Sequence, residues 1–222
     1  MEKTQVFKAL SCMRVREGGL GSEPARSGLW AGAPPAELSY YDGSTLPAGI
    51  ETSVRCLWDT EFLYVLFRGM YEELRLAPPG TPRDPATGKT PLLWQLSDVF
   101  EVFAGPRARD LRIYREFQAS PDGRFIDVAL DASGERRIAD FSWHSGVQVH
   151  SSVHGEESLW ESLFIIPWEA FSSSPLKERR WQGNFYRVSG CPENAAYCAW
   201  SSVGKIDFHQ PGFFGDLLFD GD

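Results

Sequence analysis

The stretch that decides the fold is SLWESLFIIPWEAF, residues 158–171. Its first part, 159–166, is mostly apolar or aromatic, which predicts a strand buried on both faces. Proline has no backbone N–H to donate to a sheet, so the strand should stop at Pro167. Proline also suits the first turn of a helix, which makes WEAFS at 168–172 the best candidate for a short helical turn.

Similar apolar runs recur along the chain, separated by turn-forming residues that include 21 glycines and 15 prolines. Short strands divided by turn signals are typical of all-β sandwiches and barrels. We therefore expect an all-β fold, an antiparallel β-sandwich of about ten strands with long loops and one short helical turn. The expected strands are 51–58, 62–71, 98–104, 112–119, 124–130, 146–154, 159–166, 183–190, 196–201 and 213–219.

The composition narrows the class of protein. Apolar residues make up 42% of the 222 residues and charged residues 23%, which favours a folded chain with a sizeable core. A net charge of −8 without a basic run argues against nucleic acid or an anionic membrane as a partner. No apolar run approaches the roughly 18 residues of a membrane span. The eight tryptophans suit both a β-sandwich and a carbohydrate binder, whose ligands stack on flat rings.

Two segments stand out as loops. Residues 17–49 are rich in Gly, Pro, Ala and Ser, and residues 77–91 hold five prolines. Long loops in compact domains are often functional. Because no internal repeat and no linker divides the chain, we expect one domain over 1–222, with 1–49 as its loop-rich N-terminal extension.

The N-terminus and the cysteines leave the cellular location open. The first residues carry charges and lack the hydrophobic region of a signal peptide, so the protein is cytoplasmic or begins after a cleaved leader. Cys56 lies in a strand-like run and is expected to be a buried thiol. Cys191 and Cys198 flank the segment PENAAY, where either two free thiols or a disulfide would fit.

Two neighbouring strands carry the candidate binding groups. In LLWQLSDVFEVFAGP at 92–106, Glu101 interrupts an apolar strand face. A buried carboxylate needs partners, so Glu101 either accepts hydrogen bonds from a ligand or pairs with an arginine. In RIYREFQAS at 112–120, a polar face is either solvated or, beside Trp94, a saccharide-binding surface. That face consists of Arg112, Tyr114, Glu116 and Gln118.

The sequence gives little support for a metal site, for nucleophilic catalysis or for phosphate binding. His150 and His154 lie on one strand face about 13 Å apart, too far to share a metal ion without a bend. The sequence holds no G-x-S-x-G motif and no glycine-rich phosphate loop. We therefore assign no catalytic residue and no metal ligand.

Seven motifs follow one another along the chain. They are VRCLWDTEFLYVLFRG (54–69), LLWQLSDVFEVFAGP (92–106), YREFQASPDGRFIDV (114–128), LWESLFIIPWEAF (159–171), WQGNFYRVSG (181–190), AWSSV (199–203) and FHQPGFFGDLLF (208–219). In this order they resemble the family 9 carbohydrate-binding modules and their stand-alone relatives, within a wider superfamily of DOMON-like sandwiches. The resemblance implies a β-sandwich, an IPW corner at the end of the opening stretch, and the possibility of structural calcium.

The resemblance also implies where a sugar would bind. By position, Trp94 would be the stacking ring and Glu101 an acceptor for sugar hydroxyls, and the loop that holds His209 lies where a second clamping aromatic is expected. The spacing from Trp94 to Glu101 is one residue longer than in the sugar-binding members. The second tryptophan of the clamp is absent, with Phe208, His209 and Phe213 as its possible substitutes.

The resulting prediction is a non-catalytic protein that binds a mono- or oligosaccharide and is linked to carbohydrate catabolism. Its expected ligand contacts are Trp94, Glu101, Tyr114, Arg187 and His209. Arg187 is included because it interrupts an apolar strand, although it could instead pair with Glu101. One alternative is a haem-binding DOMON-type electron-transfer domain with axial ligands Met70 and His209. Another is a glycan-processing hydrolase on the same scaffold. The oligomeric state stays open.

Overall fold

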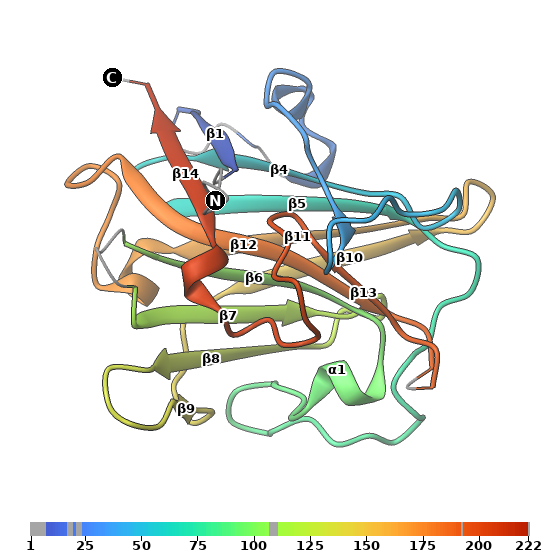
Figure 1. Ribbon diagram of the computed structural model, residues 1–222. Coiled ribbons are helices and arrows are strands. Elements are labelled where there is room, and N and C mark those ends of the chain that lie inside the picture. The colour runs from blue at the N-terminus through green and yellow to red at the C-terminus, as the bar shows by residue number, and fades with distance from the viewer. Residues whose placement is uncertain (1–7, 17–19, 21–23, 107–110, 192, 222) are drawn as a thin grey trace, which may run out of the picture.

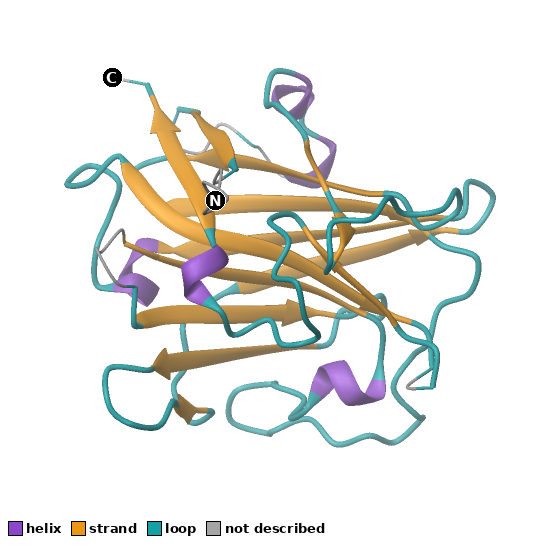
Figure 2. Ribbon diagram, in the orientation of Figure 1, coloured by secondary structure: helices purple, strands orange, loops and turns teal. Residues whose placement is uncertain are grey.

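The computed structural model describes residues 8–16, 20, 24–106, 111–191 and 193–221. Within these residues the chain forms one sheet of 14 strands, one short α-helix and four 3-10 turns (Figures 1 and 2). The strands are β1 (Ala9–Arg14), β2 (Ala36–Glu37), β3 (Ser39–Tyr40), β4 (Thr52–Trp58), β5 (Phe62–Met70), β6 (Val99–Pro106), β7 (Ile113–Ala119), β8 (Phe125–Asp131), β9 (Ile138–Asp140), β10 (Gln148–His154), β11 (Leu159–Pro167), β12 (Arg180–Ser189), β13 (Ala196–Ala199) and β14 (Gly215–Asp220). The helix is α1 (Leu93–Leu96), and the 3-10 turns are η1 (Pro24–Arg26), η2 (Gly28–Ala31), η3 (Trp168–Phe171) and η4 (Pro211–Phe213).

The sheet curls so that its two halves pack against each other. Its strand order is β10-β11-β5-β4-β1-β14-β12-β6-β7-β8-β9. The ring of Phe100 on β6 stacks on that of Phe67 on β5 at 4.7 Å and on that of Trp160 on β11 at 3.7 Å, measured between centroids. Stacked rings of this kind bury large apolar areas and join the two halves in one core.

The expected all-β fold is confirmed, but the purely antiparallel sandwich is not. Strand β1 runs parallel to both of its neighbours: Ala9 pairs with Asp216 on β14, and Met13 pairs with Leu57 on β4. β1 thus links the two halves into one continuous mixed sheet. A parallel pair needs a long crossover connection, which the segment between β1 and β4 supplies.

The opening stretch folds as expected. β11 pairs with β5 over its whole length, from Leu159 opposite Met70 to Pro167 opposite Phe62, and η3 follows directly. All ten expected strands form, with ends that shift by up to three residues. The strands β1, β2, β3 and β9 and the helix α1 were not expected. Strands β2, β3 and β9 have only two or three residues, too few for an alternating pattern to be recognised.

Five of the eight tryptophans form part of the core cluster between the two halves of the sheet, among them Trp58, Trp160 and Trp168 as expected. Trp200, for which core and surface positions were equally open, is also buried. Its ring lies against Gly215 so closely that a Cβ added there would come within 2.5 Å of the ring. A side chain at position 215 would therefore displace this part of the core.

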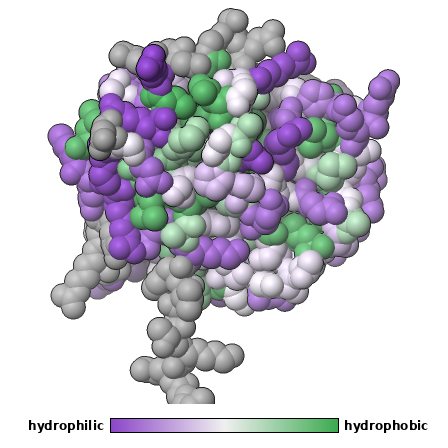
Figure 3. All heavy atoms as spheres, turned by 90° about the horizontal axis from the view of Figure 1, so that it is seen from above, coloured by the Kyte–Doolittle hydropathy of each residue, from purple (hydrophilic) through white to green (hydrophobic). Residues whose placement is uncertain are grey.

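Three further expectations concern the cysteines, membrane-spanning segments and the N-terminus. The four cysteines are free thiols, so no disulfide joins the exposed Cys191 to the buried Cys198. No helix in the described ranges is long and apolar enough to cross a membrane. The first residues, on which the reading of the N-terminus depended, include 1–7, which lie outside the described ranges. On the face seen in Figure 3, apolar side chains gather in several small groups between hydrophilic ones.

Candidate functional site

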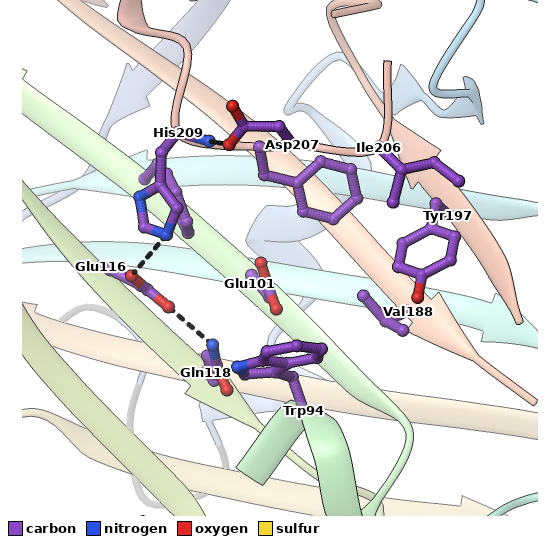
Figure 4. A pocket seen from close by; sticks show the side chains of 11 residues that line it. Trp94, Glu101, Glu116, Gln118, Val188, Tyr197, Ile206, Asp207 and His209 are labelled. Carbon is purple, nitrogen blue, oxygen red and sulfur yellow. Dashed lines mark hydrogen bonds and ion pairs between the residues drawn. The ribbon is translucent and has the colours of Figure 1, made fainter. Parts of the chain in front are cut away.

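A pocket of about 340 Å³ lies over β6, β7 and β12, on the side of these strands turned away from the main core. Helix α1 forms one wall, and the loop between β13 and β14 forms the opposite wall. Figure 4 shows Trp94 on one side, Ile206, Asp207 and His209 on the other, and Glu101 between them. The lining residues are Trp94, Glu101, Phe103, Glu116, Gln118, Val188, Tyr197, Ile206, Asp207, Phe208 and His209.

Trp94 presents its indole ring to this pocket and is 40% exposed. The turn that carries it begins at Leu92, whose φ of 53° is in the left-handed region. A residue with a Cβ adopts this conformation at a cost of about 1–2 kcal/mol, and such strain clusters at binding sites. Leu92 turns the chain from the proline-rich loop into α1, which places the indole over the pocket.

Arg75 fixes the turn that carries Trp94. Its guanidinium donates hydrogen bonds to the backbone carbonyls of Trp94, Gln95 and Ser97 at 3.0–3.1 Å. These are carbonyls that a helix end leaves without partners. The Asp98 carboxylate accepts hydrogen bonds from the backbone N–H groups of Arg75 (3.3 Å) and Gly190 (2.9 Å). Asp98 therefore anchors the base of this wall and does not line the pocket.

The floor of the pocket carries two carboxylates and an amide on adjacent strands. Glu101 on β6 lies opposite Gln118 on β7, and Glu116 lies opposite Phe103, one pair further along the same face. Both carboxylates are nearly fully buried. Gln118 Nε2 donates a hydrogen bond of 2.6 Å to Glu116 Oε1 (Figure 4). The described residues donate no side-chain hydrogen bond to the carboxylate of Glu101.

Burial of these two acids changes their protonation. The pKa of Glu116 is raised to about 7, because desolvation outweighs the hydrogen bond from Gln118 and the nearby charge of Arg137. The pKa of Glu101 is raised well above its usual range, again by desolvation and further by the charge of Glu116. Two buried carboxylates on neighbouring strands of one face cannot both ionise easily. At neutral pH the pair therefore retains at least part of a proton.

His209 closes the pocket from the loop side. Its Nδ1 lies 3.1 Å from the Tyr114 hydroxyl, with which it forms a hydrogen bond, and its Nε2 lies 3.8 Å from Glu116 Oε2. Burial, together with the charge of Arg137, lowers the pKa of His209 to about 4. The imidazole is therefore neutral at physiological pH. Next to it, Phe208 stacks on Tyr186 with a centroid distance of 4.0 Å, which fixes the loop on β12.

Three of the five expected contact residues line this pocket: Trp94, Glu101 and His209. Tyr114 is buried beneath it, where its hydroxyl orients His209. Arg187 lies elsewhere. Tyr186 pairs with Glu101, so the next residue on β12 points to the opposite face of the sheet.

Arg187 is fully buried on that opposite face. Its Nη1 donates hydrogen bonds to Thr52 Oγ1 and to the carbonyls of Ile50 and Met70, and its guanidinium lies over the ring of Phe100. Burial lowers the pKa of the Arg187 guanidinium, and the nearby Cys198 and Asp98 partly oppose this lowering. The suggested pairing of Arg187 with Glu101 is therefore wrong.

The remaining lining residues differ in how far the sequence indicated them. Glu116 and Gln118 belong to the polar face that alternation predicted for 112–118, although neither was chosen as a contact. Phe208 was expected only as a possible substitute for the second clamping ring. Asp207 and Ile206 carried no signal, because a loop has no periodicity that relates it to a distant strand.

Known proteins and solved structures show what this chain is similar to. The sequence matches no protein-family model and no curated protein. A solved structure from Bacteroides uniformis, of a protein inferred to bind carbohydrate, superimposes with a TM-score of 0.73 at 24% identity, over 97% of this chain and 100% of that one. A family 9 carbohydrate-binding module (CBM9) from Caldicellulosiruptor kristjanssonii, solved with cellotriose, gives a TM-score of 0.62 at 12% identity over 97% and 95% of the two chains. The fold is CBM9-like. The complex of such a module with glucose gives a TM-score of 0.61 at 13% identity over 97% of each chain.

The family resemblance raised two bound groups, structural calcium and haem. Structural calcium needs clustered oxygen ligands. The described part of the chain contains no group of three or more His, Cys, Asp or Glu side chains that could hold a metal ion. An axial haem pair would need Met70 and His209 at one site. They line different hollows, Met70 with Glu51 and His209 with Trp94, so this pair is not brought together.

Proposed function

We propose that this pocket binds a neutral mono- or oligosaccharide without catalysis, in the service of carbohydrate catabolism. The observation that carries the proposal is the exposed indole of Trp94 beside a floor of buried hydrogen-bonding groups in one pocket. The C–H face of a pyranose packs on an indole, and its hydroxyls need fixed polar partners. The CBM9-like fold of proteins solved with glucose and cellotriose supports the same reading.

The charges of the pocket favour a neutral ligand. Its acidic lining residues are Glu101, Glu116 and Asp207, whereas Arg137, whose charge acts on Glu116, does not line the pocket. An anionic sugar would bring a further negative charge close to these acids in a region of low dielectric constant. A hydroxyl, in contrast, can donate to a carboxylate or accept from a protonated one.

The two floor carboxylates favour one second candidate, a glycoside hydrolase. A carboxyl group whose pKa is raised to about 7 could act as a general acid. Glycosidases, however, place their two carboxyl groups on either side of the scissile bond. Here Glu101 and Glu116 both project from neighbouring strands of the pocket floor. Release of nitrophenol from a panel of p-nitrophenyl glycosides would favour this candidate over simple binding.

Isothermal titration calorimetry tests the proposal directly. The panel comprises glucose, galactose, mannose, xylose, N-acetylglucosamine, cellobiose and cellotriose at millimolar concentration. We expect at least one of them to bind. Replacing Trp94 with alanine should weaken that binding by about tenfold or more, because the stacking surface is lost.

Leu176→Ala is the matched control for Trp94→Ala. Leu176 is 52% exposed and lies outside the pocket, so its removal should leave the affinity unchanged. The fold of both variants is checked by circular dichroism. If the wild-type protein binds no sugar of the panel, or if Trp94→Ala binds as well as wild type, the proposal fails.

A further inference from the structure

A second, smaller hollow of about 120 Å³ adjoins the pocket. Four residues line both spaces: Trp94, Glu116, Gln118 and His209. Three of them form the chain of contacts from His209 through Glu116 to Gln118 that is drawn in Figure 4. These side chains therefore form the boundary between the two spaces, and a ligand seated against Trp94 can reach into both.

The second hollow differs from the pocket in its chemistry. Its floor consists of buried apolar side chains from α1 and β8, and its rim carries the exposed apolar residues Leu92 and Phe141. Arg137 is its remaining charged lining residue besides Glu116. The floor residues are Leu93, Ile126, Val128 and Leu130. A sugar ring placed on this floor would leave its hydroxyls without hydrogen-bond partners, which is costly.

The size and the lining of the hollow suit a small apolar group. Dry cavities of about 150 Å³ with aliphatic and aromatic walls bind molecules the size of benzene. The hollow is open at its rim, so a group attached to a ligand in the neighbouring pocket can enter it without the protein unfolding around it.

A polar atom marks the junction of the two spaces. Gln118 is 3% exposed, and its Oε1 has no hydrogen-bond partner among the described residues, whereas its Nε2 is held by Glu116. A buried acceptor without a donor is rare in folded proteins and points to a missing partner. A ligand hydroxyl next to the apolar group would supply that donor.

We infer that the ligand is a glycoside with a small apolar aglycone, about the size of a phenyl ring. The sugar lies in the pocket on Trp94, the aglycone lies in the apolar hollow, and a hydroxyl between them donates to Gln118 Oε1. This inference rests on the proposed function, since it assigns the class of carbohydrate that the same site selects.

Calorimetric titration with pairs of glycosides tests the inference. The probes are the methyl and phenyl β-D-glucosides, galactosides, mannosides and xylosides, and the methyl and phenyl α-anomers of each. For the sugar that binds, we expect the phenyl glycoside to bind about tenfold more tightly than the methyl glycoside, because its ring is removed from water.

A variant whose new side chain fills the hollow provides the decisive test. Ala139 on β9 lines the hollow and pairs with Leu130 of its floor, so Ala139→Phe should fill the space from its rim. We expect this variant to lose the preference for the phenyl glycoside while the methyl glycoside binds as before. Ile138→Phe is the matched control, because Ile138 is 65% exposed and points to the other face of the same strand.

The outcomes separate the two proposals. If methyl and phenyl glycosides bind equally to the wild-type protein, or if the preference survives in Ala139→Phe, the apolar subsite is refuted and sugar binding stands. If no glycoside of either kind binds while a free sugar of the first panel does, the subsite is refuted and sugar binding stands; if no sugar of either panel binds, both proposals fail.

Discussion

Replacing Lys89 with methionine should destabilise the protein by about 3–5 kcal/mol, the cost of leaving one buried charge without its partner. Lys89 is 4% exposed, and its Nζ lies 2.5 Å from Oδ1 of the fully buried Asp127. The same ammonium donates hydrogen bonds to the backbone carbonyls of Asp127, Phe141 and Trp143. Methionine keeps the volume of the side chain but removes the cation beside Asp127 Oδ1 and the donor to these three carbonyls.

Urea unfolding measures this loss. Lys177→Met, at an exposed position, is the matched control and should change the free energy of unfolding by less than about 0.5 kcal/mol. Adding Asp127→Asn to Lys89→Met removes the orphaned charge while Oδ1 of the new amide can still accept from the backbone N–H of Ser145, as Asp127 does at 2.6 Å. The double variant should therefore recover part of the stability. A Lys89→Met protein as stable as wild type would refute the assignment.

The Lys89 contacts also bear on the candidate site. They tie the proline-rich loop of 77–91 to the segment after β9, which carries Phe141 on the rim of the apolar hollow. In the Lys89→Met variant, loosening of this loop should therefore reduce the preference for the phenyl glycoside more than it reduces the affinity for the methyl glycoside.

Replacing Glu116 with glutamine should make the protein more stable than wild type at high pH, by roughly 3 kcal/mol at pH 8.5. The pKa of Glu116 is about 7 in the folded protein and 4.5 as its reference value. Because the folded state holds the proton more tightly, Glu116 contributes stability below pH 4.5, and this contribution is lost as the pH rises through 7. Glutamine cannot ionise, and its Oε1 can still accept the hydrogen bond from Gln118.

The free energies of unfolding of the wild-type and Glu116→Gln proteins, measured at pH 5 and pH 8.5, test the direction of this pH dependence. The advantage of Glu116→Gln should shrink to below about 1 kcal/mol at pH 5, where most of the wild-type carboxyl is protonated in the folded state. The matched control is Glu156→Gln, at an exposed position, for which no such dependence is expected. Wild-type and Glu116→Gln proteins whose stabilities change in parallel with pH would show that Glu116 is not the titrating group.

Alternation and turn chemistry were enough to predict most of the sheet. The run 159–166 reads as a strand because its apolar residues can be buried on both faces, and Pro167 ends it because a proline cannot donate to the ladder. The same alternation placed Glu101 on an otherwise apolar face and gathered Glu116 and Gln118 on one face of the next strand. These are local properties, so they can be read without knowledge of the partner strands.

Register and long-range pairing were not accessible in this way. Arg187 looked like a ligand contact because it interrupts an apolar strand, yet its pairing places it opposite Phe100 and on the other side of the sheet from Glu101. A shift of one residue in register reverses the face of every side chain in a strand, and the sequence of a single strand does not fix that register.

The amino-acid sequence alone thus determined an all-β chain with a tryptophan and a row of polar groups that could meet at one surface. Only the tertiary structure decided that β1 joins the halves in parallel, that the loop of Ile206–His209 faces Trp94, and that an apolar hollow lies beside the carboxylates. The physical reason is that a strand pattern records which faces are buried, whereas a pocket depends on which distant segments pack together.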